Sequence, residues 1–146
     1  KTFLEMYNCY HLLKNLGYKK IAFSYGASVY NKESLHPNPE LGKALGRIQL
    51  ISTLYERGVI LKNDRIHLLG CSVPQEFGWY KDFPFIESLD TSNPVMAAMD
   101  NTPYTTSGLS KKPISNLNSC FNIHYSKVDH DLVDFNTQMF RSINNL

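Results

Sequence analysis

Three segments of the chain repeat apolar residues every three or four positions, which is the spacing of an amphipathic helix. They cover residues 2–16, 39–57 and 128–143. Gly17 and Gly58 directly follow the first two segments, and a glycine in this position commonly ends a helix. We therefore predict three amphipathic helices, the first two with defined ends.

The middle helix is predicted to begin at Pro39, because a proline fits the first turn, where its missing N–H has no partner to lose. Its apolar stripe is Leu41, Leu45, Ile48, Ile51 and Tyr55. The charged residues of this segment are expected on its solvated face, and these are Lys43, Arg47, Glu56 and Arg57.

Short apolar runs at residues 21–23, 66–69 and 85–89 lie between these helices and end in small or polar residues. A short helix is expected from Pro74 and another from Pro94. Each strand thus follows a helix, and crossovers of this length imply parallel strands with right-handed connections. The expected fold class is α/β, either the last strands of a (β/α)8 barrel or a small open sheet.

Two segments lack apolar periodicity. Residues 31–39 contain two prolines and two asparagines, and residues 101–119 are rich in Asn, Thr, Ser and Pro, so both are expected to be loops. The chain begins at Lys1, already inside a helical pattern, which suggests a fragment of a longer protein. We expect residues 1–108 to form the main α/β segment and residues 109–146 to form a loop and a C-terminal helix.

The composition excludes several classes of protein and of site. The chain has 146 residues, of which 42% are hydrophobic and 19% charged, with a net charge of +2. No apolar run is long enough to span a membrane, and no signal peptide is expected, which favours a cytoplasmic location. The three cysteines, Cys9, Cys71 and Cys120, form no CxxC pair, so we expect neither a disulfide framework nor a zinc site, and no cofactor.

Candidate chemistry lies where two predicted strands end, because ligands of α/β proteins bind beyond the carboxyl ends of parallel strands. Asp90 ends the third strand and could serve as nucleophile, general base or cation ligand. It could equally cap the next helix or form a turn. Gly70 ends the second strand, where it could admit a ligand close to the backbone or simply make a turn.

Neighbouring residues allow further interpretations. His67 alternates within its strand and is more typical of a hydrogen-bonded structural imidazole than of a catalytic one. Tyr25, Trp79 and Tyr80 could stack on a base, although core packing is the simpler expectation. Gln75 and Glu76 fit the first turn of a short helix.

Together these segments resemble the tRNA-guanine transglycosylase superfamily. The family has a strand that ends in a Gly-x-Gly-x-Pro turn, followed by a strand that ends in Asp-x-x-x-Pro. The corresponding segments here are Gly70–Phe77 (GCSVPQEF) and Asp90–Pro94 (DTSNP). Upstream, Leu16–Tyr18 (LGY) and Ile21–Ala27 (IAFSYGA) resemble the family's helix end and glycine-rich loop. The resemblance covers residues 1–108.

The resemblance implies the C-terminal three strands of a (β/α)8 barrel. It implies exchange of a guanine-type base in tRNA or DNA for a 7-deazaguanine, through a covalent intermediate on Asp90. Leu69 and Gly70 would line the base pocket, and Gly26 and Ala27 would offer backbone groups to the base. The partners would be a nucleic acid and a guanine or 7-deazaguanine base.

The chain departs from the family pattern in ways that indicate a divergent branch, such as its viral or DNA-modifying relatives. Val95 and Met96 follow Pro94, where bacterial members have Thr-Arg. The Cys-x-Cys-x-x-Cys…His zinc site is absent, and so are the general-acid Asp and the base-reading residues of the earlier strands. The alternative function is a catalytically inactive barrel-derived module that binds nucleic acid or a protein partner.

Overall fold

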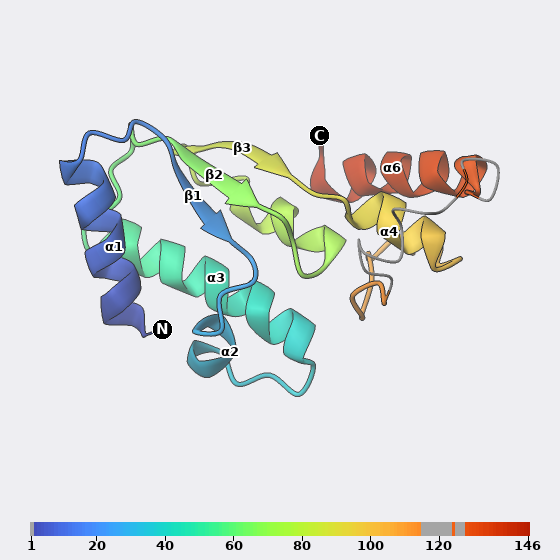
Figure 1. Cartoon of the computed structure of the whole chain (residues 1–146), viewed down its shortest axis with the longest axis horizontal. Coiled ribbons are helices and arrows are strands. Elements are labelled where there is room, and N and C mark those ends of the chain that lie inside the picture. The colour runs from blue at the N-terminus through green and yellow to red at the C-terminus, as the bar shows by residue number, and fades with distance from the viewer. Residues whose placement is uncertain (1, 115–123, 125–127) are drawn as a thin grey trace.

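The chain folds as alternating helices and strands. The computed structural model describes residues 2–114, 124 and 128–146 (Figure 1). Along the chain the elements are α1 (Phe3–Asn15), β1 (Ile21–Ser24), α2 (Tyr30–Glu33), α3 (Pro39–Glu56), β2 (Ile66–Leu69), the 3-10 helix η1 (Pro74–Tyr80), β3 (Ile86–Asp90), α4 (Asn93–Met99) and α6 (His130–Asn144).

The three strands form one parallel sheet in the order β1-β2-β3. This confirms the predicted α/β class and the parallel pairing. The sheet is open, and the described residues form no closed barrel. Helices α1 and α3 and the 3-10 helix η1 lie on one side of it, and no helix of the described residues covers the opposite face, called the uncovered face below (Figure 1). None of the helices in the described part of the chain has the length and apolar character needed to cross a bilayer.

The alternation of side chains along β1 and β2 explains this one-sided packing. Ile21, Phe23, Ile66 and Leu68 are buried on the helix-covered face. Their neighbours Ala22, Ser24, His67 and Leu69 are exposed or half-buried on the other face. Parallel sheets are usually covered on both faces, so a face that no described element covers is an unusual feature of this sheet.

The predicted helix ends are confirmed. Thr2 forms a capping box with Glu5 at the start of α1. The side chain of Asn38 caps α3, whose first residue is Pro39, as expected. Gly17 adopts a left-handed conformation with φ of 85° just after α1.

Three sequence predictions about this region were wrong. The segment expected to be a loop at residues 31–39 starts with most of α2, which packs against α3. The buried stripe of α3 contains Arg47, Leu50, Ile51 and Leu54, whereas Leu45 of the predicted stripe is exposed. Arg47 was expected on the solvated face, but its side chain is completely buried because it pairs with Glu76.

The C-terminal helix α6 packs against α4 and η1. Phe140 joins the hydrophobic core, and Asn136 accepts a hydrogen bond from the backbone N–H of Tyr104 at 2.8 Å. Asn144 similarly accepts from the N–H of Gly78 at 2.6 Å. This helix is therefore fastened to the α/β segment by buried amide side chains as well as by apolar contacts.

The crossing of α2 over α3 predicts a destabilising substitution at Gly46. A Cβ atom at this position would lie 2.1 Å from the carbonyl oxygen of Tyr30, so the backbone of α2 must move to admit it. We expect Gly46→Ala to lower the free energy of unfolding by about 1–3 kcal/mol, as overpacking does in other cores. Urea denaturation followed by circular dichroism measures this.

Gly26→Ala is the matched control, because a Cβ there would meet only the side chain of Ser24, at 3.8 Å. We expect its unfolding midpoint to stay close to that of the parent protein. Equal stability of the two variants would show that α2 does not pack on α3 in solution.

Candidate functional site

The carboxyl ends of the three strands meet at one edge of the sheet. Ser24, Leu69 and Asp90 are aligned across it by the strand register. Gly26 and Ala27 stand two and three residues after the end of β1, and Gly70 directly follows β2. All five residues predicted from the sequence, Gly26, Ala27, Leu69, Gly70 and Asp90, therefore belong to this edge.

The carboxylate of Asp90 is oriented by the backbone of the neighbouring strand end. The N–H of Gly70 donates to Asp90 Oδ1 at 2.8 Å and to the Asp90 carbonyl oxygen at 3.1 Å. Gly70 has φ of 66°, and a Cβ there would lie 2.5 Å from the ring of Tyr25. Glycine is thus required at residue 70 for two reasons, the left-handed backbone and the close approach of Tyr25.

The rest of the Asp90 side chain remains accessible. It is 56% exposed, and no described residue donates a hydrogen bond to its second oxygen, Oδ2. The N-cap of α4 is Ser92, and it is Thr91 Oγ1 that accepts from the Asn93 N–H. Asp90 therefore does not cap this helix, which was the alternative interpretation of its position.

His67 is the side chain beside Asp90 on the uncovered face. Its Nε2 lies 3.6 Å from Asp90 Oδ1, and its Nδ1 lies 2.9 Å from Ser88 Oγ. Lys20 donates to the same serine oxygen at 3.1 Å. His67 is thus hydrogen-bonded, as its sequence position suggested.

A one-residue bulge in β3 determines which way Asp90 faces. Ile66 pairs with Ile86, but His67 pairs with Ser88, so Glu87 is left without a partner in the ladder. The shift places Asp90 opposite Leu69, on the uncovered face. Without it, strict alternation from Ile86 would turn Asp90 toward the helices.

Glu87 is held at the bulge by two cations. Arg65 donates to it through Nε at 2.7 Å and Nη2 at 2.8 Å, and Lys20 lies 3.1 Å away. The hydrogen bonds from Arg65, with further help from Lys20, lower the pKa of Glu87 to about 2. Its charge is thus retained at all ordinary pH values.

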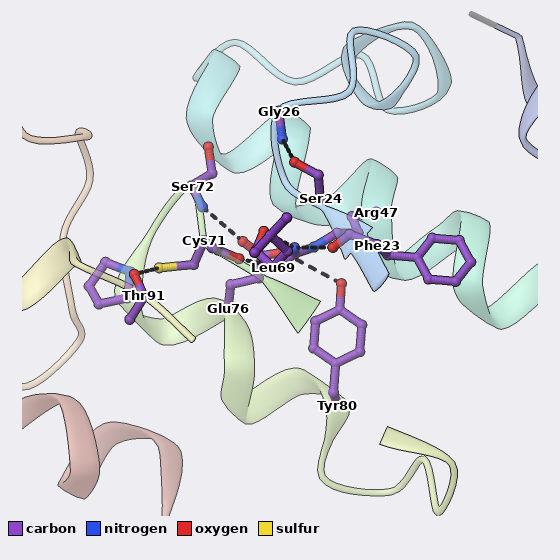
Figure 2. A network of polar contacts seen from close by, with 12 residues as sticks. Phe23, Ser24, Gly26, Arg47, Leu69, Cys71, Ser72, Glu76, Tyr80 and Thr91 are labelled. Carbon is purple, nitrogen blue, oxygen red and sulfur yellow. Dashed lines mark hydrogen bonds and ion pairs between the residues drawn. The ribbon is translucent and has the colours of Figure 1, made fainter. Parts of the chain in front are cut away.

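A buried ion pair fixes the ends of β1 and β2 from the helix side (Figure 2). Arg47 Nε donates to Glu76 Oε1 at 2.7 Å, and both side chains are fully buried. Arg47 Nη1 donates to the carbonyl oxygen of Phe23 at 3.0 Å, and Nη2 donates to that of Gly70 at 2.9 Å. One guanidinium therefore binds backbone atoms at the ends of two strands.

Glu76 extends this network into the loop after β2. Its Oε2 accepts from the N–H of Ser72 at 3.1 Å. Burial alone would lower the pKa of Arg47, but the adjoining carboxylate of Glu76 outweighs it and raises that pKa. The arginine is accordingly charged, and the network holds the backbone that presents Gly70 to Asp90.

A cavity of about 340 Å³ opens beside this edge. It is lined by Tyr25, Gly70, Cys71, Thr91, Ser92, Asn93, Met96, Lys112, Pro113 and Ile114. Of the five predicted site residues only Gly70 lines it, together with Tyr25, which the sequence analysis named as a possible base-stacking residue. Asp90 adjoins the cavity through Thr91. The thiol of Cys71 lies 3.2 Å from Thr91 Oγ1, and burial raises its pKa to about 12, so this cysteine is neutral.

Other sequence candidates have structural roles or stay untested. Gln75 pairs with the backbone of Leu109, donating to its carbonyl oxygen at 2.9 Å and accepting from its N–H at 3.1 Å. Tyr80 is buried in the core. Cys9 and Cys71 are free thiols, and Cys120 lies outside the described residues. No three His, Cys, Asp or Glu side chains in the described ranges are grouped to hold a metal ion.

Sequence reasoning missed the residues that support the site. Arg47 could have been recognised, because it stands three, four and seven positions before the apolar residues Leu50, Ile51 and Leu54. An arginine in such a stripe indicates either that the buried face of the helix is predicted wrongly or that the arginine forms an ion pair inside the core. Nothing in the sequence pattern pointed to Lys112, because it is brought to the cavity by a segment without regular structure.

Comparison with known proteins adds no assignment: no family model, curated protein or solved structure matches the chain.

Proposed function

We propose that the chain carries the nucleophile of a glycosyltransferase that exchanges a guanine-type base in nucleic acid for a 7-deazaguanine. The observation that carries this proposal is the environment of Asp90. One carboxylate oxygen is held by the Gly70 N–H at 2.8 Å, while the side chain as a whole is 56% exposed at the end of β3. A carboxylate with one anchored and one open oxygen is suited to attack an electrophilic carbon.

The proposed reaction is a double displacement at the sugar carbon C1′. Asp90 Oδ2 attacks C1′ of the target nucleotide, and the C1′–N bond breaks with its electron pair leaving on the outgoing base. The incoming base then attacks C1′ and releases the carboxylate. The outgoing base gains the proton that the incoming base loses, so the exchange is balanced. Such displacements pass through an oxocarbenium-like centre, which a fixed anion opposite the leaving group stabilises.

The arrangement of the sheet supports a barrel origin. Helices lie on one face of the three parallel strands, and the other face carries His67, Leu69 and Asp90. We infer that these are the last strands of a (β/α)8 barrel, with this face turned inward. Active sites of such barrels lie at the carboxyl ends of the strands, where Asp90 stands.

The test is base exchange by the protein expressed from its complete reading frame. It is incubated with labelled guanine or a labelled 7-deazaguanine, in one arm with tRNA and in the other with duplex DNA. Label retained in the polymer after precipitation supports the proposal, and the arm that retains it identifies the nucleic acid.

Absence of label from both polymers, with protein shown to be folded, would contradict the enzyme proposal. The alternative would then be the inactive barrel-derived module, for which nucleic-acid or protein binding without exchange is the diagnostic result.

A further inference from the structure

We propose that the cavity beside Asp90 binds a backbone phosphate of the polynucleotide, next to the nucleotide that Asp90 attacks. This inference rests on the proposed function and adds to it a phosphate subsite. The cavity shares Gly70 with the Asp90 environment, and Thr91 is the residue after the nucleophile. A volume of about 340 Å³ accommodates a phosphodiester with part of its sugar.

Lys112 supplies the charge of this subsite. Its Nζ donates to the Tyr25 hydroxyl at 2.5 Å and lies 4.7 Å from the centroid of the Tyr25 ring. Tyr25 thereby fixes the ammonium group at the wall of the cavity. No ion pair joins Lys112 to a carboxylate in the part of the chain that the structure describes, so its charge is available to a ligand.

Asn93 supplies a second donor from the floor of the cavity. Asn93 is only 5% exposed, and its Oδ1 accepts a hydrogen bond from the Tyr104 hydroxyl at 2.5 Å. Its NH2 group has no acceptor among the described residues, although the residue lines the cavity. This amide group can therefore donate to an oxygen of a ligand in the cavity.

The lining as a whole favours an anion. Ser92 and Thr91 add hydroxyl groups, and no Asp or Glu is among the described residues that line the cavity. One lysine and several neutral donors are typical of protein contacts to nucleic-acid phosphates. Because the cavity adjoins the nucleophile, the phosphate it fits best is one flanking the target nucleotide.

Fluorescence anisotropy with labelled oligonucleotides tests the subsite in the full-length protein. Lys112→Gln is compared with Lys111→Gln. The control removes an equal charge from the preceding residue, whose side chain does not line the cavity. We expect Lys112→Gln to weaken binding about 3- to 10-fold and to reduce the salt slope by roughly 0.7–0.9, the loss of one phosphate contact. Lys111→Gln should change binding less than about twofold.

A methylphosphonate scan separates a backbone phosphate from a free one. Neutralising one linkage beside the target guanine should weaken binding to the parent protein but not to Lys112→Gln. RNA and DNA oligonucleotides are tested in parallel, and inorganic phosphate serves as competitor. Equal losses for the two lysine variants, or a methylphosphonate effect that survives Lys112→Gln, would overturn the subsite.

The base-exchange assay keeps this result separate from the proposed function. Exchange that depends on Asp90, combined with unaltered binding by Lys112→Gln, would overturn the phosphate subsite and leave the proposed function in place. Binding that depends on Lys112 without any exchange would support the subsite and contradict the enzyme.

Discussion

Replacing Asp90 with asparagine is expected to abolish base exchange and leave the fold intact. A neutral amide cannot form the covalent bond to C1′, and loss of a nucleophile costs a rate factor of at least about a thousand. The fold should persist because the side chain is 56% exposed and an amide oxygen can still accept from the Gly70 N–H. Label retained in the polymer measures exchange, and thermal denaturation measures the fold.

Asp82→Asn is the matched control for charge, because Asp82 is an exposed carboxylate in the turn before β3. It should exchange bases at the parent rate. A protein–nucleic acid adduct that survives denaturation is expected for the parent and for Asp82→Asn but not for Asp90→Asn. Unchanged turnover in Asp90→Asn would remove this residue from the mechanism.

Arg47→Met is expected to lower the free energy of unfolding by about 3–5 kcal/mol, the usual effect of removing one partner of a buried ion pair. The carboxylate of Glu76 would remain in the core without its cation, and the carbonyl oxygens of Phe23 and Gly70 would lose their donor. Urea denaturation measures the loss. The control is Lys43→Met in the same helix, because the half-buried ion pair of Lys43 with Glu40 should contribute less than about 1 kcal/mol.

The Arg47→Met variant should also respond to pH. Burial raises the pKa of Glu76, and without Arg47 nothing comparable opposes that shift. The folded variant would then bind a proton that the unfolded chain releases at lower pH, so its stability falls as the pH rises above the ordinary glutamate pKa. Replacing Glu76 by Gln in the same chain should remove this pH dependence. A variant as stable as the parent at all pH values would show that the pair is not buried in solution.

The parts of the fold that were predicted correctly are those that local sequence encodes. The main helices were predicted from the glycines that follow α1 and α3 and from Pro39 at a helix start, and the strands were predicted from short apolar runs. The alternation of helices and strands predicted the parallel pairing. The (β/α)8 barrel cannot be predicted from local sequence in the same way. Closing a barrel requires further strands, and the three short apolar runs of this chain say nothing about them. The sheet is open across the described residues.

The candidate site was predictable only in its position. Strand ends placed Leu69, Gly70 and Asp90 at one edge, but not the direction of each side chain. The burial of Arg47 depends on a partner 29 residues away, and the approach of Lys112 to Tyr25 spans 87 residues. Interactions between residues so distant in sequence leave little trace in local periodicity, so they had to come from the structure.

The bulge at Glu87 has a consequence for how this chain can evolve. Because side chains alternate along a strand, the direction of Asp90 depends on how many residues separate it from Ile86, and not only on which residues they are. A chain with one residue fewer between Ile86 and Asp90 would need no bulge, because regular alternation alone would place the carboxylate on the uncovered face. A chain of the present length that lost the bulge would turn the carboxylate toward the helices, although its sequence motif was unchanged. Lineages that keep the Asp-x-x-x-Pro motif can therefore preserve the geometry of the site in two ways, with a bulged strand of this length or with a regular strand that is one residue shorter.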